Sequence, residues 1–197
     1  MRILFVCVPR TGSSSFIKSL SKSLDIPYIS IPDSYSYEQN SSFIESSIRK
    51  DRVIFRMSPN NNVGYNLKEF CLFFDKVILL SRLDDKDHYE SLVNLYYREH
   101  IIEYGTKGLY VYEDIPQASL NEIEKVINYE EVKDQKKQIE QLGLELKQEV
   151  IYYEDIFYSN KVINYLTSEF AEFNREVYEN TIAQTKKQRI SRKTVLI

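Results

Sequence analysis

Residues 3–16 read Ile-Leu-Phe-Val-Cys-Val-Pro-Arg-Thr-Gly-Ser-Ser-Ser-Phe, an apolar run followed by a turn and a serine-rich segment. The unbroken apolar run from Ile3 to Val8 predicts a central parallel strand that is covered on both faces. Gly12 permits a sharp backbone turn. Residues 13–24 then carry apolar side chains at helical spacing. The stretch therefore predicts a strand, a tight loop and a helix, which together are typical of the start of an α/β fold.

Further strands and helices alternate along the chain. The patterns predict strands at 26–31, 52–57, 76–80 and 150–153, and helices at 43–49, 67–74, 120–142 and around 162–170. Asp84 or Asp85 caps one more predicted helix. Its core-facing stripe consists of Tyr89, Leu92, Val93, Tyr96, Tyr97, His100, Ile101 and Tyr104. This order predicts an α/β three-layer sandwich with a central, mostly parallel sheet.

The 197 residues suit a single domain, because no linker rich in Pro, Gly or Ser divides them. The formal net charge of -3 argues against a general nucleic-acid binder, which needs a broad basic surface. The apolar run after Arg2 is too short for a signal sequence or a membrane span, so we expect a cytoplasmic protein that does not enter a membrane. Cys and His residues lack metal-ligand spacing, so we expect no metal.

Residues 8–16, called the anion loop below, have the composition of a phosphate- or sulfate-binding turn. Gly12 lets the backbone approach a ligand. Ser13, Ser14 and Ser15 place backbone N–H groups at a helix N-terminus, where free donors and partial positive charge favour an anion. Arg10 adds a planar guanidinium suited to phosphate or sulfate oxygens. A helix cap that binds nothing is the alternative interpretation of the serine cluster.

The anion loop does not match the common nucleotide-binding motifs. A Walker A loop requires G-x-x-x-x-G-K-[ST]. Here Ser13 follows Gly12 where lysine is required, and Cys7 stands where the first glycine is required. The dinucleotide fingerprint G-x-G-x-x-G is also absent. An ordinary nucleoside triphosphatase is therefore not expected.

A second candidate cluster follows the strand predicted at 76–80. Arg82 stands just after this strand, and Ser91 lies nine residues later in the next predicted helix. An arginine at a strand's carboxyl end and a serine at this spacing are able to converge on one phosphate. Taken singly, Arg82 is an ordinary loop charge and Ser91 an ordinary helix serine.

Three motifs in chain order resemble those of the sulfotransferases: PRTGSSS in the anion loop, the LLSR…S pattern of residues 79–91, and YEDI at residues 153–156. The spacing of Arg82 and Ser91 is most similar to that of bacterial trehalose sulfotransferases of the Stf0 type. A second YEDI lies at 112–115, but the later copy is preferred because a predicted strand precedes it and a predicted helix follows. The resemblance implies the P-loop-NTPase-like topology of this family.

The resemblance also implies a donor and roles for individual residues. The donor co-substrate is 3'-phosphoadenosine 5'-phosphosulfate. Its 5'-phosphosulfate is expected against the anion loop, which includes Thr11, and its 3'-phosphate against Arg82 and Ser91. A basic tail begins at about residue 184, and its Lys187 and Arg189 are expected to close over the nucleotide. The alternative is that this tail is a solvated terminus.

The sequence indicates candidates for catalysis but does not identify the acceptor. Arg10 is expected to stabilise charge on the transferring group. Glu38 is the first candidate for the general base and His88 the second, whereas His100 belongs to the core-facing stripe. Arg56 ends a predicted strand and is able to face the transferring group. We expect the acceptor to be a hydroxyl or amine of a small molecule, a carbohydrate or a peptide.

Two other functions remain open at this point. The segment after Cys7 superficially resembles the C-x5-R loop of tyrosine phosphatases, although Arg10 follows Cys7 by only three residues. A phosphatase or phosphotransferase is therefore one alternative. The other is a non-catalytic nucleotide- or anion-binding protein that retains the sulfotransferase fold, because the chain is short and no residue is clearly marked as a base.

Overall fold

The computed structural model describes residues 1–30, 44–45, 49–59, 66–97, 112 and 115–194, except for the side chains of residues 158 and 185–194. Within these residues, five strands form one all-parallel sheet in the order β2-β3-β1-β4-β5. The strands are β1 (Arg2–Cys7), β2 (Tyr28–Ser30), β3 (Val53–Met57), β4 (Lys76–Ser81) and β5 (Val150–Tyr152). The predicted α/β class and central parallel sheet are confirmed.

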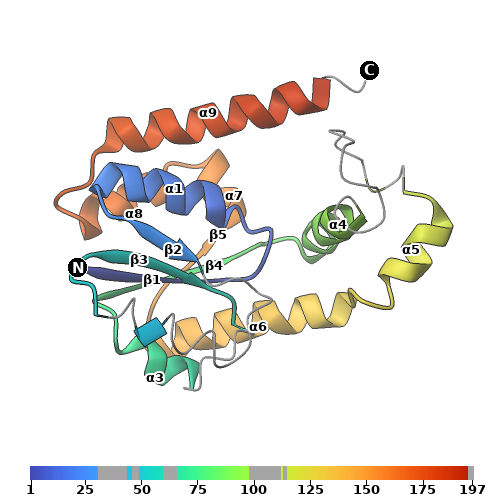
Figure 1. Cartoon of the computed structure of the whole chain (residues 1–197), viewed down its shortest axis with the longest axis horizontal. Helices are drawn as coiled ribbons and strands as arrows, with labels where there is room; N and C mark the ends of the chain where they lie inside the picture. Colours follow the sequence, from blue (N-terminus) through green and yellow to red (C-terminus); the bar gives the residue numbers. More distant parts are fainter. Residues whose placement is uncertain (31–43, 46–48, 60–65, 98–111, 113–114, 195–197) are drawn as a thin grey trace.

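Helices cover both faces of the sheet, as predicted (Figure 1). Alternate residues of β1 supply the two sides: Ile3 and Phe5 join a core with α1 (Ser13–Leu24), whereas Leu4 and Val6 join a second core. The first core also includes α7 (Tyr153–Tyr158), α8 (Lys161–Glu169) and α9 (Arg175–Thr194), and the second includes α3 (Leu67–Cys71) and α6 (Tyr129–Leu146). This double burial explains the uninterrupted apolar sequence of β1.

At the carboxyl ends of the strands, α4 (Asp85–Tyr96) and α5 (Gln117–Ile123) extend away from the sheet (Figure 1). Asp84 caps α4 and accepts a hydrogen bond from Asp87 N at 2.8 Å, as predicted. Val93 and Tyr97 of the predicted stripe are buried in a third, smaller core with Leu120 and Ile123. The helix thus has its own apolar support beside the sheet.

Several predicted boundaries are wrong. The helix expected at 120–142 is two helices, α5 and α6, and Asn128 caps the second by accepting from Glu130 N at 2.8 Å. The strand expected from residue 26 begins only at Tyr28, after Pro27, which has no N–H to donate to a strand ladder. The helix expected at 67–74 ends at Cys71. The backbone of the predicted basic tail continues α9 as far as Thr194.

Helix α9 packs on the outer side of α1 and runs antiparallel to it (Figure 1). Asn174, just before α9, lies against Ser23 near the end of α1, where the Ser23 hydroxyl donates to the Asn174 carbonyl at 2.8 Å. Four residues later, the Tyr178 ring makes an edge contact with the Phe16 ring near the start of α1. The later half of α9 therefore continues past the beginning of α1, toward the carboxyl end of the sheet.

Candidate functional site

The carboxyl ends of β1 and β4 are adjacent, since Cys7 of β1 pairs with Leu80 of β4. The chain leaves β1 toward β2 and leaves β4 toward β5, and these strands lie at opposite edges of the sheet. In open parallel sheets, such a reversal creates a crevice outside the carboxyl ends where ligands bind. The anion loop follows β1 and Arg82 follows β4, so both predicted clusters begin at this crevice.

The anion loop ends in a helix start with free donors. Gly12 is the N-cap residue of α1, with φ of 72° and ψ of 6°. Its carbonyl accepts hydrogen bonds from the amides of Ser15 and Phe16 at 3.1 and 3.0 Å. Within the described part of the chain, the amides of Ser13 and Ser14 donate to no acceptor. These two N–H groups and the helix dipole favour an anion.

Aromatic side chains of α7 pack against Gly12. A β-carbon added to Gly12 would lie 2.7 Å from Phe157 Cε2 and 2.9 Å from Tyr153 Cδ2. These distances are shorter than any ordinary carbon–carbon contact, and the positive φ is a conformation that side-chain-bearing residues rarely adopt. The loop therefore requires glycine here for two separate reasons.

Arg10 is exposed and makes a long-range side-chain contact. Its Nε donates to Ser91 Oγ of α4 at 3.1 Å, across 81 positions of sequence. The backbone of Arg10 has φ of 66°, which is unusual for a residue other than glycine. Such a conformation costs about 1–3 kcal/mol and persists only where surrounding contacts hold it. Arg10 therefore stands in a position that the rest of the fold maintains.

One of these contacts comes from His88 of α4, which is fully buried. His88 Nε2 lies 2.7 Å from the Pro9 carbonyl oxygen, and Nδ1 has no hydrogen-bond partner among the described residues. The carbonyl only accepts, so Nε2 carries the proton. Burial lowers the pKa of His88, the Pro9 hydrogen bond opposes this, and nearby Arg82 lowers the pKa further. The role of His88 as a base stays a prediction, while its observed contact positions the loop.

Thr11 also fixes the loop from within. Its side chain is fully buried, and its Oγ1 donates to the Val8 carbonyl at 2.9 Å. The hydroxyl of Thr11 is thus committed inside the loop, and its predicted contact with the donor stays a prediction. Ser13 is buried, Ser14 is exposed and Ser15 is half-buried.

Arg82 directly follows β4 at the same end of the sheet, and its side chain is only 14% exposed. Its guanidinium carbon is 4.7 Å from the centre of the Tyr153 ring. Its nearest carboxylate contacts, Nη2 to Asp87 Oδ2 and Nε to Glu154 Oε1, are both 3.8 Å, too long for hydrogen bonds. Arg82 Nε is buried without an acceptor in the described residues. Asp87 and Glu154 compensate the charge of Arg82, and the Nε–H group of Arg82 remains able to donate a hydrogen bond to a ligand.

The structure brings the two predicted clusters together, and the expected convergence of Arg82 and Ser91 on one phosphate stays a prediction. Ser91 contacts Arg10 and not Arg82, whereas Arg82 stacks on Tyr153, whose ring also lies against Gly12. Tyr153 therefore connects the anion loop with the end of β4. The later YEDI copy follows a strand, as predicted, but it forms the start of a helix of its own, α7, which begins at Tyr153.

Arg56 of β3 provides a third guanidinium near this end of the sheet. Its Nε donates to Cys7 Sγ at 3.3 Å, and its Nη1 donates to Ser30 Oγ at 3.1 Å. Arg56 thus spans from β2 to β1 beneath the anion loop and is half-buried. Its predicted contact with a transferring group stays a prediction.

Some predicted site residues cannot be placed. Glu38 and His100 lie outside the described residues, as does most of the earlier YEDI copy. Lys187 and Arg189 belong to α9 by their backbone, but their side chains are not among those described.

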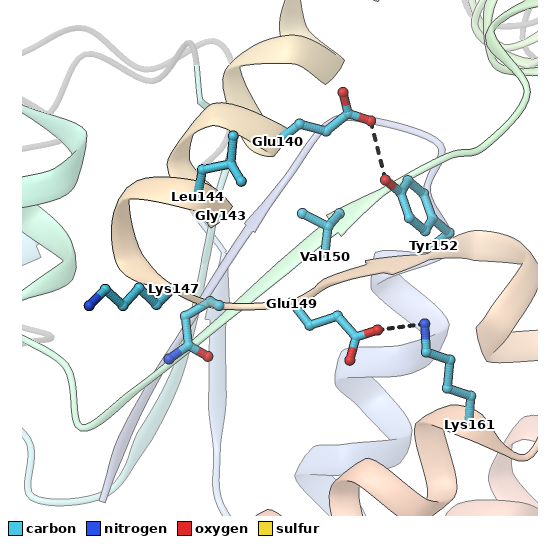
Figure 2. Close-up of a pocket in the computed structure, with 9 residues that line it drawn as sticks. Glu140, Gly143, Leu144, Lys147, Glu149, Val150, Tyr152 and Lys161 are labelled. Atoms are coloured by element: carbon cyan, nitrogen blue, oxygen red, sulfur yellow. Dashed lines mark hydrogen bonds and ion pairs between the residues drawn. The ribbon is translucent and has the colours of Figure 1, made fainter.

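Two pockets lined by described residues lie away from the crevice. One has a volume of about 690 Å³ and lies between α6, β5 and the start of α8 (Figure 2). Tyr152 donates to Glu140 at 3.2 Å and Lys161 contacts Glu149 at 2.6 Å in this pocket, which Lys147 also lines. The other, of about 380 Å³, lies between α7, α8 and α9 and is lined by both apolar and polar side chains. Neither Arg10 nor Arg82 lines either of these pockets.

Two features of the site escaped the sequence analysis. The contact of His88 with Pro9 joins segments 79 positions apart, and no local pattern indicates it. Glu154 accepts from Leu83 N at 3.1 Å and faces Arg82, so it links the start of α7 to the segment that follows β4. The YEDI motif marked Tyr153 and Glu154 as part of a family pattern, without indicating what they contact.

Comparison of the chain with protein-family models, with curated proteins and with solved structures gave no match. Among the described residues, no cluster of three or more His, Cys, Asp or Glu side chains is placed to hold a metal ion. Nor does any helix in the described ranges combine the length and apolar character needed to cross a membrane. The site geometry and the sequence motifs therefore carry the functional assignment.

Proposed function

We propose that the protein is a sulfotransferase that binds 3'-phosphoadenosine 5'-phosphosulfate outside the carboxyl ends of β1 and β4. The acceptor is a hydroxyl or amine of a small molecule, a carbohydrate or a peptide. The single observation that supports this most is the placement of Arg10 and Arg82 near the start of α1, where two amides have no acceptor among the described residues. The motif resemblance adds the identity of the donor.

The two guanidinium groups suit a ligand with two separated anionic groups. Arg10 stands on the loop before α1 and is exposed, whereas Arg82 is mostly buried and lies against the Tyr153 ring, which also contacts Gly12. An anion at the helix start would meet the amides of Ser13 and Ser14 together with Arg10. A second phosphate would meet the Nε–H donor of Arg82, which lacks an acceptor in the described residues. One phosphate alone would leave one of the guanidinium groups unused.

The proposed reaction is an in-line transfer of the sulfuryl group. The acceptor oxygen or nitrogen forms a bond to sulfur while the bond from sulfur to the bridging phosphate oxygen breaks. The acceptor proton passes to a general base, and 3'-phosphoadenosine 5'-phosphate leaves. Arg10 and the α1 amides would stabilise the negative charge that develops on the bridging and sulfuryl oxygens, as preorganised donors do in phosphoryl transfer.

Glu38 remains the first candidate for the base. His88 is the weaker one, because its ring is fully buried and its Nε2 proton is engaged with Pro9. A base must lie within hydrogen-bond reach of the acceptor atom, directly or through one water.

Calorimetric titration with 3'-phosphoadenosine 5'-phosphate tests the donor site. We expect the wild type to bind, and Arg10→Ala and Arg82→Ala each to weaken binding about tenfold to a hundredfold, since hydrogen bonds to charged groups contribute about 1.5–3 kcal/mol. Lys22→Ala is the matched control, because it removes a positive charge from the exposed last turn of α1, away from the loop. Its affinity should equal that of the wild type.

The outcomes separate the donor site from the reaction. A wild type with no affinity for the nucleotide overturns the proposal, and unchanged affinity in both arginine variants overturns the residue assignment. Radiolabelled donor is then offered with trehalose, a tyrosine-containing peptide and a simple phenol. Binding without any transfer favours the non-catalytic alternative, and hydrolysis of p-nitrophenyl phosphate favours a phosphatase.

A further inference from the structure

One face of α4 contacts the anion loop at two points. His88 and Ser91 are three positions apart, so their side chains lie on the same face of the helix. His88 Nε2 is 2.7 Å from the Pro9 carbonyl oxygen, and Ser91 Oγ accepts from Arg10 Nε at 3.1 Å. A single helix therefore holds both the backbone of the loop and the side chain of its arginine.

His88 holds the peptide group that sets the conformation of Arg10. The Pro9 carbonyl belongs to the planar peptide unit between Pro9 and Arg10, so rotation of this plane changes ψ of Pro9 and φ of Arg10 together. Arg10 has φ of 66°, whereas most residues prefer a negative value. If the carbonyl were released, the plane would rotate, Arg10 would relax, and its guanidinium would leave its present position.

The same hydrogen bond keeps a carbonyl dipole away from the anion. A carbonyl oxygen carries partial negative charge and would repel a phosphate or sulfate that it faced. The Val8 carbonyl accepts from Thr11 Oγ1 at 2.9 Å, and the Pro9 carbonyl accepts from buried His88. Both carbonyl groups are thus engaged by donors from within the protein, whereas the N–H groups of Ser13 and Ser14 have no acceptor among the described residues.

We propose that His88, in its neutral form with the proton on Nε2, is the positioning residue that preorganises the anion loop, with Ser91 as its partner one turn later. The consequence for nucleotide binding rests on the proposed function. The contacts of His88 and Ser91 with the anion loop, called the clamp below, are a property of the protein without ligand.

Two substitutions of His88 separate the hydrogen bond from the volume of the ring. His88→Gln keeps an amide N–H that reaches the Pro9 carbonyl, whereas His88→Leu keeps apolar bulk but removes the donor. Val93→Ala is the matched control, because Val93 is fully buried on the same helix but belongs to the smaller core with Tyr97 and Leu120. It loosens α4 without touching the loop.

Amide hydrogen exchange of Ser15 and Phe16, whose N–H groups donate to the Gly12 carbonyl, is the first measurement in the ligand-free protein. We expect His88→Leu to speed exchange of these amides at least about tenfold through local opening, and His88→Gln to restore protection. Nitrogen NMR of the wild type should show the proton of His88 on Nε2. Calorimetry with 3'-phosphoadenosine 5'-phosphate should show weaker binding for His88→Leu and near-normal binding for His88→Gln.

Several results would overturn the clamp. Amide exchange in the loop could be unchanged in His88→Leu, or Val93→Ala could speed it equally. NMR could place the His88 proton on Nδ1, or a variant with a loosened loop could bind the nucleotide as tightly as the wild type. If the wild type binds no nucleotide, the proposed function fails, and exchange and NMR alone judge the clamp.

Discussion

Gly12 has φ of 72°, and a methyl group added there would overlap the rings of Phe157 and Tyr153. We expect Gly12→Ala to lower the free energy of unfolding by about 2–4 kcal/mol, which combines the strain of a positive φ with overpacking. Urea denaturation measures this. Ser14→Ala, at an exposed position two residues later, is the control and should change stability little.

A double-mutant cycle separates the two contributions at Gly12. Replacing Phe157 by Leu removes the ring atom nearest to the added methyl group. The cost of Gly12→Ala should then fall by about 1 kcal/mol, and the remainder should reflect backbone strain. A cost that is independent of Phe157 would show that the contact between α7 and the loop is not tight in solution.

His88 predicts a pH dependence of stability. Burial lowers its pKa below the usual value of 6.5, and the charges facing it are Arg82 at the end of β4, Asp85 on α4 and Lys136 on α6. The unfolded chain therefore binds more protons than the folded chain as pH falls below about 6.5, so stability must decrease there. We expect the wild type to lose more stability than His88→Gln between pH 7 and pH 5.5 in urea denaturation. Equal losses would mean that His88 titrates normally in the folded state.

The contacts of Arg10 and His88 show where sequence reasoning about the site stops. The anion loop was predicted from local features: an apolar strand, a glycine and serines at a helix start. The hydrogen bond from Arg10 to Ser91 spans 81 positions, and it depends on how α4 is placed against the sheet. The sequence predicted that Arg82 and Ser91 converge on one phosphate, which stays a prediction, but it held no signal for the contact between Ser91 and Arg10, because that contact depends on tertiary packing.

The helices and strands that were predicted best are those whose own sequence shows a continuous apolar face. Helix α1 begins and ends at the predicted residues, because Gly12 starts it and a continuous apolar face buries it. The break between α5 and α6 lies in a charged stretch without a clear stripe, where Asn128 supplies the new cap. Helix α9 was missed because only isolated residues such as Tyr178 and Ile182 enter the core.

The direction of α9 indicates where its basic second half lies relative to the sheet. The helix starts beside the end of α1 and passes its beginning after Tyr178. Residues 184–194 then extend about 15 Å further at 1.5 Å per residue. This direction leads past the carboxyl end of the sheet (Figure 1). The predicted role of Lys187 and Arg189 at the nucleotide is therefore compatible with the course of the helix.

Removal of this basic segment changes the net charge of the protein, and this change provides a test of the segment's role in binding. Residues 184–197 contain five positive and no negative side chains, so their removal changes the formal net charge from -3 to -8. We expect truncation after Ala183 to keep the fold, since Tyr178 and Ile182 remain in the core with α1. Affinity for 3'-phosphoadenosine 5'-phosphate should fall several-fold, and the loss should shrink at high salt because screening weakens charge attraction.

The double variant Lys187→Gln/Arg189→Gln distinguishes a specific contact from general attraction. If these two residues hold the nucleotide, the double variant should account for most of the loss seen on truncation, and calorimetry at two salt concentrations should show a remainder that salt abolishes. If the double variant binds normally while truncation weakens binding, the segment acts only through its overall charge. If truncation leaves affinity unchanged at low salt, the later half of α9 has no part in the site, and the arginines at the ends of β1 and β4 must bind the donor without it.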